Sequence, residues 1–245
     1  MISVVIISKN EAGNIAVCIQ SALRISNDVI VIDSGSTDGT QQIAKDAGAK
    51  VVEVAWEGFG NTRNTGSLEA VNNWIFSLDC DERISEELAA SIGQLRLTQM
   101  DKVYAFKRLN FLGNKPVHYG EWGRDTVNRL YNRNYTSWTS EPVHETIELR
   151  GNKPELISGN LIHYTYKNPK VFAQKMEYYA SLYAARYASK MKHVPFIKRY
   201  LSPVFSFIQN YFFRLGFLDG KAGFIIAKTT ALYTYLKYKK LASLK

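Results

Sequence analysis

The chain has 245 residues, of which 46% are hydrophobic and 22% charged, a composition typical of a globular protein rather than a disordered or fibrous one. Its two cysteines, Cys18 and Cys80, are too few for a disulfide framework or a four-cysteine zinc site, so a reducing, cytoplasmic setting is expected. The opening MISVVIISKNE has no small-residue cleavage site, which argues against a secretory signal peptide.

The net charge of +9 is concentrated near the end of the chain. Residues 190–245 carry eleven Lys and Arg against one acid, Asp219, so the rest of the chain is close to neutral. These cations are interleaved with apolar and aromatic residues over 201–218 and 222–236, which favours an anionic membrane surface over a nucleic-acid partner. Charges such as Arg214 interrupt every window long enough to cross a bilayer. We therefore expect a peripheral protein on the inner face of the cytoplasmic membrane, and a helical subdomain with a solvated basic face is the alternative.

The first 97 residues alternate between predicted strands and helices. Strands are expected over 2–8, 28–33, 50–54 and 74–78, and helices over 12–23, 40–47, 61–71 and 85–97. Ser85 is the expected N-cap of the last of these helices. This order predicts an α/β fold with a mostly parallel central sheet and helices on both of its faces.

The pattern changes in the second half of the chain. Residues 103–166 show short strand signals and turns, and the chain beyond Pro169 has the spacing of helices. We therefore expect a catalytic domain over residues 1–166, divided into halves over 1–97 and 98–166, followed by a basic, aromatic helical region over 167–245.

Acidic residues follow three of the predicted strands, at the edge where open α/β sheets bind ligands. Glu11 follows the first strand, Asp33 ends the second, and Asp79 and Asp81 follow the fourth. Residues two apart on an extended segment point the same way, so Asp79 and Asp81 are expected to converge while Cys80 turns inward. Two neighbouring carboxylates stay ionised together when a cation neutralises them, which predicts a Mg²⁺ or Mn²⁺ site.

Several common enzyme motifs are missing from the sequence. The first turn, SKNEAGN, lacks the glycines of a dinucleotide-binding turn, and the chain has neither a P-loop nor a Gly-x-Ser-x-Gly elbow. The four histidines are scattered, which argues against a zinc site. A glycoside hydrolase and a non-catalytic nucleotide- or sugar-binding module stay open as alternatives, although Asp79 and Asp81 are expected to lie too close together for a hydrolase pair.

Four segments, in this order and at these spacings, carry a family resemblance: ISKNEAGNI, VIVIDSGSTDGT, WEGFGNTRNTG and SLDCDER. They resemble the nucleotide-sugar-binding half of inverting glycosyltransferases of family 2, which have the GT-A fold. The later segments GEWGRDTVNRLYNR, EPVHETI, IHYTY and FLDGKAGFIIA are similar to the subgroup that builds the inner core of bacterial lipopolysaccharide, including its glucosyltransferases. The resemblance implies a hexosyltransferase that uses a nucleotide-diphospho-sugar, with UDP-hexose expected, and a lipid-linked saccharide acceptor; another cell-envelope or exopolysaccharide acceptor is the alternative.

The resemblance also implies roles for residues on the donor side. Ser8, Asn10 and Glu11 would contact the nucleoside, with Glu11 accepting from the ribose hydroxyls. Asp33 would accept from the uracil N–H, in a turn shaped by Ser36 and Asp38. Arg63 would reach the pyrophosphate or the donor sugar. Asp79 and Asp81 match the family's Asp-x-Asp pair, with Asp81 as the direct ligand of the divalent cation.

On the acceptor side, the resemblance implies a carboxylate base that takes the proton from the acceptor hydroxyl. Glu145, sixteen residues after Arg129, is the favoured base, and Asp125 is its main rival. Trp122, Arg129 and His144 are the expected acceptor contacts. His163 could approach the cation or pack in the core, and Trp138 could stack on a sugar or anchor a loop.

Overall fold

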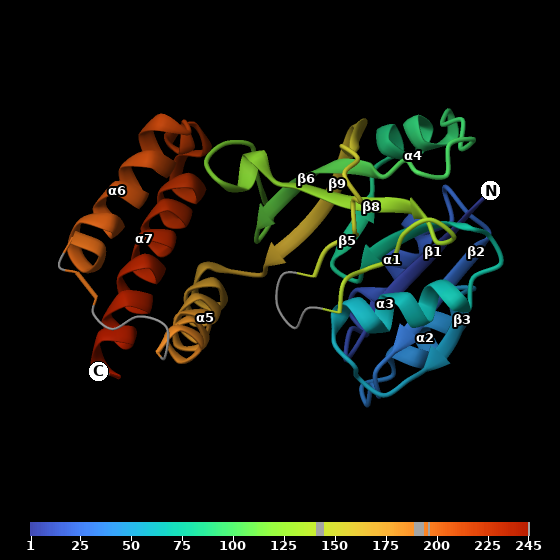
Figure 1. Cartoon of the computed structure of the whole chain (residues 1–245), viewed down its shortest axis with the longest axis horizontal. Helices are drawn as coiled ribbons and strands as arrows, with labels where there is room; N and C mark the ends of the chain where they lie inside the picture. The colour runs from blue at the N-terminus through green and yellow to red at the C-terminus, as the bar shows by residue number, and fades with distance from the viewer. Residues whose placement is uncertain (141–144, 189–193, 196, 245) are drawn as a thin grey trace. The chain divides into compact units, whose positions relative to one another are not determined.

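The structure is a computed structural model that describes residues 1–140, 145–188, 194–195 and 197–244 (Figure 1). The chain divides into two compact units, Met1–Arg108 with Thr126–His163, and Leu109–Asp125 with Tyr164–Lys245. We call these the catalytic unit and the helical unit. The boundary near residue 164 lies close to the one expected at 166, but residues 109–125 group with the helical unit rather than with the first domain.

The catalytic unit begins with alternating strands and helices. Its first part contains β1 (Ile2–Ser8), α1 (Ile15–Ala22), β2 (Asp28–Asp33), α2 (Thr40–Asp46), β3 (Lys50–Glu53), α3 (Phe59–Leu68), β4 (Trp74–Asp79), β5 (Glu82–Ile84) and α4 (Glu86–Gly93). Three further strands follow, β6 (Tyr104–Leu112), β8 (Thr126–Asn132) and β9 (Glu155–Tyr166), of which β6 and β9 continue into the helical unit. The predicted strands over 2–8 and 28–33 are confirmed residue for residue.

The sheet of this unit has the order β3-β2-β1-β4-β8-β6-β9-β5. The strands β3, β2, β1 and β4 are parallel, as the alternation of strands and helices predicts. Beyond β4 the pairs β4–β8, β6–β8 and β5–β9 are antiparallel, so the sheet is mixed rather than mostly parallel. The mixed α/β, GT-A-like fold class is confirmed, with the parallel part confined to the first half of the chain.

Both faces of the parallel strands are covered by helices, because side chains along a strand point to alternate faces. Val4 and Ile6 of β1 pack in one core with residues of α1, α2 and α4. Val5 packs in a second core on the other face, where α3 lies against β1 and β2. Gly66 of α3 makes that approach possible, since a Cβ there would lie 2.4 Å from Cγ1 of Val5.

Two predicted helices are shorter in the structure. The helix expected over 12–23 begins at Ile15, and the residues just before it form a turn in which the Asn14 and Ile15 N–H groups donate to the Glu11 carbonyl. The helix expected over 85–97 ends at Gly93, since glycine is a poor helix former. Its predicted cap is confirmed, as the Ser85 hydroxyl accepts from the Leu88 N–H at 3.1 Å.

The helical unit has its own core. Its elements are β7 (Lys115–Val117), η1 (Trp122–Arg124), α5 (Pro169–Tyr187), η2 (Ile197–Leu201), α6 (Ser202–Ile208), η3 (Gln209–Phe213), η4 (Gly216–Asp219) and α7 (Gly220–Ser243). Leu112 and Val117 pack with Phe172 of α5 and Ile226 of α7, which explains why residues 109–125 belong here. Across the described residues, no helix is both long enough and apolar enough to cross a bilayer.

Candidate active site

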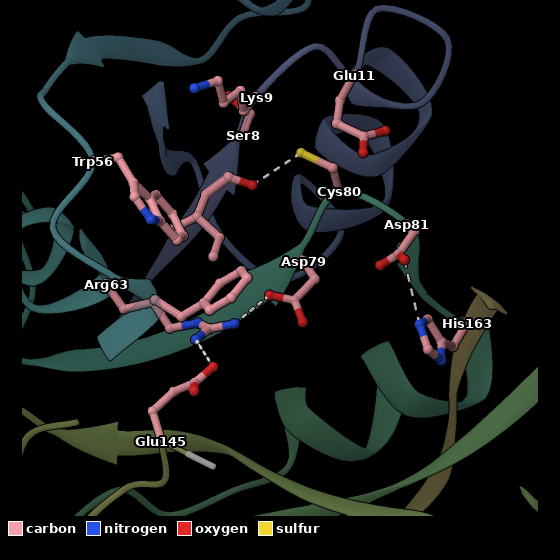
Figure 2. A pocket seen from close by; sticks show the side chains of 12 residues that line it. Ser8, Lys9, Glu11, Trp56, Arg63, Asp79, Cys80, Asp81, Glu145 and His163 are labelled. Atoms are coloured by element: carbon pink, nitrogen blue, oxygen red, sulfur yellow. Dashed lines mark hydrogen bonds and ion pairs between the residues drawn. The ribbon is translucent and has the colours of Figure 1, made fainter. Parts of the chain in front are cut away.

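A pocket of about 540 Å³ opens at the carboxyl ends of β1 and β4, the edge at which the sequence predicts a ligand (Figure 2). It lies wholly within the catalytic unit. Its polar lining comes from the ends of β1 and β4 and the segments that follow them, from α3, from β9 and from a loop residue, Glu145: Ser8, Lys9, Glu11, Arg63, Asp79, Asp81, Glu145 and His163. Trp56, Phe59, Ile7 and Cys80 complete the wall. Segments far apart in the sequence therefore supply both acids and bases to one cavity.

Asp79 ends β4 and is held by two arginines. Its Oδ1 lies 2.7 Å from Nη2 of Arg63, and its Oδ2 lies 2.6 Å from Nη2 of Arg129. Burial alone would raise the pKa of Asp79, but the charges and hydrogen bonds of Arg129 and Arg63 outweigh it and hold the pKa below its usual range. The charge of Asp79 is thus neutralised by the protein itself.

Asp79 and Asp81 both line the pocket, but their carboxylates have different neighbours. Figure 2 shows Asp79 directed toward Arg63 and Asp81 directed toward His163, whose Nε2 lies 3.4 Å from Oδ2 of Asp81. Two guanidinium groups bind the carboxylate of Asp79, and the expectation that the two carboxylates converge stays a prediction. Cys80 does turn inward as expected, with its Sγ 3.1 Å from the Ile7 carbonyl, and burial raises the pKa of its thiol.

A divalent cation fits best beside Asp81. Carboxylate oxygen suits Mg²⁺ and Mn²⁺, and the imidazole of His163 offers a second donor within reach of the same position. In the part of the chain that the structure describes, no three His, Cys, Asp or Glu residues gather closely enough to enclose an ion. Asp81 and His163 could therefore hold a cation whose remaining ligands are water and substrate oxygens.

Arg129, an expected acceptor contact, is buried between two carboxylates and is not among the residues that line the pocket. It is only 3% exposed, and its Nη2 lies 2.6 Å from both Oδ2 of Asp79 and Oε1 of Glu82. Glu82 is fully buried, is paired at 3.4 Å with Arg108, and accepts from the Asp79 N–H at 3.1 Å. Burial would lower the pKa of Arg129, but Asp79 and Glu82 raise it above its usual value. Arg129, Asp79 and Glu82 thus form a buried ion-pair network at the end of β4.

Arg63 connects Asp79 to Glu145. Its Nη1 lies 3.4 Å from Oε1 of Glu145, and its guanidinium carbon lies 4.4 Å from the ring centroid of Trp138. Trp138 is buried and donates from Nε1 to the Ser77 hydroxyl at 3.1 Å, so it anchors the wall rather than offering a face to a sugar. Arg63 and Glu145 both line the pocket, as the sequence predicts for residues that reach a donor or an acceptor.

The turn after β2 is organised by Asp33, which does not reach the pocket. Asp33 is 0% exposed, and its carboxylate accepts from the Ser8 hydroxyl at 2.8 Å, the Ser36 N–H and hydroxyl, and the Gln41 amide at 2.8 Å. Burial would raise the pKa of Asp33, but these hydrogen bonds lower it overall. Because its acceptor sites are filled by the protein, the expected contact of Asp33 with a uracil N–H is not supported.

The turn after β1 packs on the same loop. Asn10 has a φ of 55°, and its Oδ1 accepts from the Thr37 N–H at 2.9 Å while its own N–H donates to the Ser36 hydroxyl at 2.8 Å. Asp38 accepts from the Thr40 hydroxyl and from the Ala12 and Thr40 N–H groups, and these bonds lower its pKa. Glu11 lines the pocket and accepts from the Asn14 amide at 2.7 Å. Ser8, Asn10, Glu11, Ser36 and Asp38 therefore lie together, with Glu11 and Ser8 at the cavity itself.

Two expected acceptor-side residues, Asp125 and Trp122, belong to the helical unit. Asp125 belongs to the helical unit and accepts from the Asn110 amide at 3.0 Å. Trp122 packs there against Tyr166 and Phe172, with ring centroids 5.8 and 5.2 Å apart, so it serves the core of that unit. His144 lies outside the described residues.

Sequence reasoning missed several residues of the site. Glu82 is one of them, because nothing in a local sequence pattern shows that this acid is fully buried. Trp56 and Phe59, with ring centroids 4.7 Å apart at the pocket wall, carry no periodic signal. Lys9 follows β1 directly, and its position at a strand end is the signal that could have included it.

Comparisons with known proteins place these features in a family. The chain is 28% identical to an uncharacterized glycosyltransferase of Rickettsia prowazekii (strain Madrid E), over 99% of this chain and 87% of that protein. It is 29% identical to the lipopolysaccharide core biosynthesis glycosyltransferase LpsC of Rhizobium meliloti (strain 1021), over 98% of this chain and 91% of that protein.

Solved structures share a smaller part of the chain. The glucosyl-3-phosphoglycerate synthase of Mycobacterium tuberculosis, solved with Mn²⁺, uridine diphosphate and glucosyl-3-phosphoglycerate, is 25% identical with a TM-score of 0.37. This match covers 45% of the present chain and less than half, 44%, of that one. The family model of Glycosyl transferase family 2 matches residues 3–138, more than half of the chain. The chain therefore belongs to glycosyl transferase family 2, and it is a glycosyltransferase.

Proposed function

We propose that this enzyme transfers a hexose from a uridine-diphospho-sugar to a saccharide of the lipopolysaccharide core, with inversion at the anomeric carbon. The observation that carries the proposal is the pocket at the ends of β1 and β4, which holds Asp81 beside His163 and, separately, Glu145 beside Arg63. An inverting transfer needs these two functions, support for a leaving diphosphate and a base for the acceptor. Because the chain belongs to a family of glycosyltransferases, the two alternatives from the sequence, a glycoside hydrolase and a non-catalytic nucleotide- or sugar-binding module, are not pursued.

The donor would lie along the ends of β1 and β4. Glu11 and Ser8 offer oxygens to the ribose hydroxyls, over the turn that Asp33 braces with Ser36 and Asp38. Lys9 and Arg63 are the cationic groups that line the pocket and suit the negative diphosphate. Asp81, with His163, would hold a Mg²⁺ or Mn²⁺ ion, which when bound offsets the charge of the departing diphosphate.

Glu145 is the proposed base. Its carboxylate lines the pocket, and the guanidinium of Arg63 at 3.4 Å orients it. Arg63 also binds Asp79, so one side chain fixes the distance between the base and the end of β4. Asp125, which belongs to the helical unit, stays the alternative base. Arg129 acts through Asp79 as a positioning residue, and Trp122 is set aside as an acceptor contact because it packs in a core.

The acceptor is proposed from the relative LpsC, which matches nearly the whole chain. A lipid-linked acceptor also agrees with the helical unit, where large apolar side chains are exposed near cations: Phe205 is 61% exposed and Phe213 74%, close in sequence to Lys198, Arg199 and Arg214. Aromatic side chains with Lys and Arg suit the headgroup region of an anionic bilayer. We therefore place the enzyme on the cytoplasmic face of the inner membrane, without a nucleic-acid partner.

Mass spectrometry of lipopolysaccharide tests the acceptor. A strain that lacks this gene should make a core short of one hexose, and the purified wild-type enzyme should restore that mass from UDP-hexose and the truncated lipopolysaccharide. Glu145→Gln protein should not restore it. An unchanged core in the deletion strain, with a changed exopolysaccharide instead, would show that another cell-envelope glycan is the acceptor.

A further inference from the structure

A second pocket, of about 350 Å³, lies within the helical unit, where α5, η2 and the end of α7 meet. Three cations and one acid line it: Arg199, Lys239, Lys240 and Glu177. The rest of its lining is uncharged. The pocket therefore carries an excess of positive charge in a concave, partly apolar surface.

Two of these cations are not neutralised. Lys240 lies 3.6 Å from Oε1 of Glu177 and donates to the Ser181 hydroxyl at 2.8 Å. Arg199 and Lys239 have no carboxylate partner among the described residues. An anion in the pocket would therefore meet two cations whose charge no described carboxylate offsets.

Aromatic rings hold both side chains without cancelling their charge. The Arg199 guanidinium lies 5.2 Å from the ring centroid of Tyr200, and the Lys239 ammonium lies 5.7 Å from that of Tyr235. Cation–π contacts of this kind restrict the side chains while leaving their N–H donors available. The pocket thus presents a guanidinium fork and an ammonium in fixed positions, the combination that suits a tetrahedral phosphate.

We propose that this pocket binds a phosphate group, supplied by the headgroup of an anionic membrane lipid. Apolar side chains flank the pocket along the chain: Ile197 and Leu201 are exposed on either side of Arg199, and Leu244 is exposed just after the lining residue Ser243. A lipid brings phosphate and acyl chains together, which matches this combination. The lipid source rests on the membrane association proposed above, whereas the phosphate site itself does not depend on the transfer reaction.

The first arm of the test uses inorganic phosphate with the full-length protein, titrated by calorimetry at constant ionic strength. The double variant Arg199→Gln, Lys239→Gln should bind phosphate at this pocket about tenfold more weakly, the loss expected for a charge-assisted hydrogen bond. The control Lys198→Gln, Lys228→Gln removes the same charge from exposed positions outside the pocket and should bind like the wild type. Because both variants keep the transferase pocket, any phosphate bound there is common to them.

The second arm identifies the source of the phosphate. Vesicles of phosphatidylcholine with phosphatidylglycerol should bind the control variant about tenfold more tightly than the pocket variant of equal charge. Inorganic phosphate should displace the wild-type protein from these vesicles better than sodium chloride does at equal ionic strength. The double variant Arg199→Lys, Lys239→Arg keeps both charges and should retain vesicle binding. The helix content of each variant, measured by circular dichroism, checks that it is folded.

Two results would overturn the proposal. Equal phosphate binding by the pocket variant and its control would show that this pocket is not a phosphate site. Loss of phosphate binding in the pocket variant, with vesicle binding equal to that of the control, would show that the phosphate comes from a soluble compound and not from a lipid. Nucleoside diphosphate release by the same preparations is measured separately, so a failure of the proposed transferase activity is distinguishable from either result.

Discussion

Asp79 and Asp81 are two residues apart, yet the structure gives them different surroundings. Asp79 is fixed between Arg63 and Arg129, whereas Asp81 lies beside His163 at the pocket. Two negative charges at one strand end would otherwise repel each other. Neutralising one of them with arginine leaves the other as the carboxylate that a cation can use, and it links the strand end to Glu145 through Arg63.

The role of Glu145 is tested by the change Glu145→Gln, which removes the proton acceptor but keeps the size of the side chain. The rate of transfer at saturating donor should fall by roughly 10²–10⁴-fold, the usual contribution of a general base, while donor affinity stays close to that of the wild type. Steady-state kinetics with donor binding by calorimetry measure both quantities. The control is Glu148→Gln, a partly exposed carboxylate that pairs only at 3.8 Å with Arg150. An active Glu145→Gln enzyme together with an inactive Asp125→Asn enzyme would transfer the role to Asp125.

The pKa of Asp33 makes a prediction about pH. Burial is outweighed by the hydrogen bonds from Ser36, Gln41 and Ser8, so the folded-state pKa lies below the unfolded value. A lowered pKa contributes stability that is present above the unfolded pKa of about 3.9 and is lost as the pH falls through the folded pKa. The free energy of unfolding in urea should therefore be higher for the wild type than for Asp33→Asn at pH 7, and this difference should shrink below about pH 4. A difference that stays constant down to pH 3 would contradict the hydrogen-bonding account.

At the scale of elements, the approach of α3 to the sheet decides where Arg63 lies. Gly66 sits on the buried side of α3, where an added Cβ would come within 2.4 Å of Val5 and 2.8 Å of Ile32. Gly66→Ala should lower the free energy of unfolding by about 1–3 kcal/mol, as expected for overpacking. Gly13→Ala is the matched control, because nothing lies within 4 Å of its added Cβ. Urea unfolding of both variants measures the difference, and equal stabilities would mean that α3 moves freely away from the strands.

The elements that sequence could predict are those with a local pattern. The runs ISVVIIS and DVIVID are buried along their length and give β1 and β2, and the acids at strand ends mark the correct edge of the sheet. The buried ion-pair network of Arg129, Asp79 and Glu82 could not be predicted, because it depends on which strand lies beside β4. The antiparallel register that pairs Phe76 with Leu130 brings Arg129 to Asp79 and Glu82, and such pairing between distant segments has no local signal.

The positive charge of the molecule is concentrated in the helical unit. Residues 190–245 of this unit contain eleven Lys and Arg and one acid, Asp219, which gives them a net charge of +10. The catalytic unit holds the pocket at the ends of β1 and β4, and the helical unit holds exposed aromatic side chains such as Phe205 and Phe213. Because the two features lie in different units, we expect that substitutions can change membrane binding without changing the rate of sugar transfer, and the reverse.

Membrane binding should depend on both charge and exposed phenylalanine. Replacing Phe205 and Phe213 with serine should weaken binding to anionic vesicles about tenfold or more, since each ring loses apolar area that the bilayer would bury. Salt should weaken wild-type binding, because attraction between exposed charges is screened over about 8–10 Å at 0.1–0.15 M. Vesicle sedimentation measures both effects, and the control replaces Leu68 and Val71, exposed apolar residues of the catalytic unit, with serine. Wild-type protein that stays in the supernatant with anionic vesicles at low salt would show that the aromatic residues are structural.

We propose above that the pocket at the ends of β1 and β4 transfers a sugar with the help of a cation held at Asp81. The most direct measurement is the release of uridine diphosphate from UDP-hexose with truncated lipopolysaccharide as acceptor, for the wild type and Asp81→Asn, across a titration of Mn²⁺. We predict saturable activation of the wild type by Mn²⁺, loss of activity in EDTA, and a rate for Asp81→Asn that is lower by about two orders of magnitude or more, as expected when several kcal/mol of charge stabilisation are removed. Equal rates for the two proteins, or full wild-type turnover in EDTA, would contradict the claim.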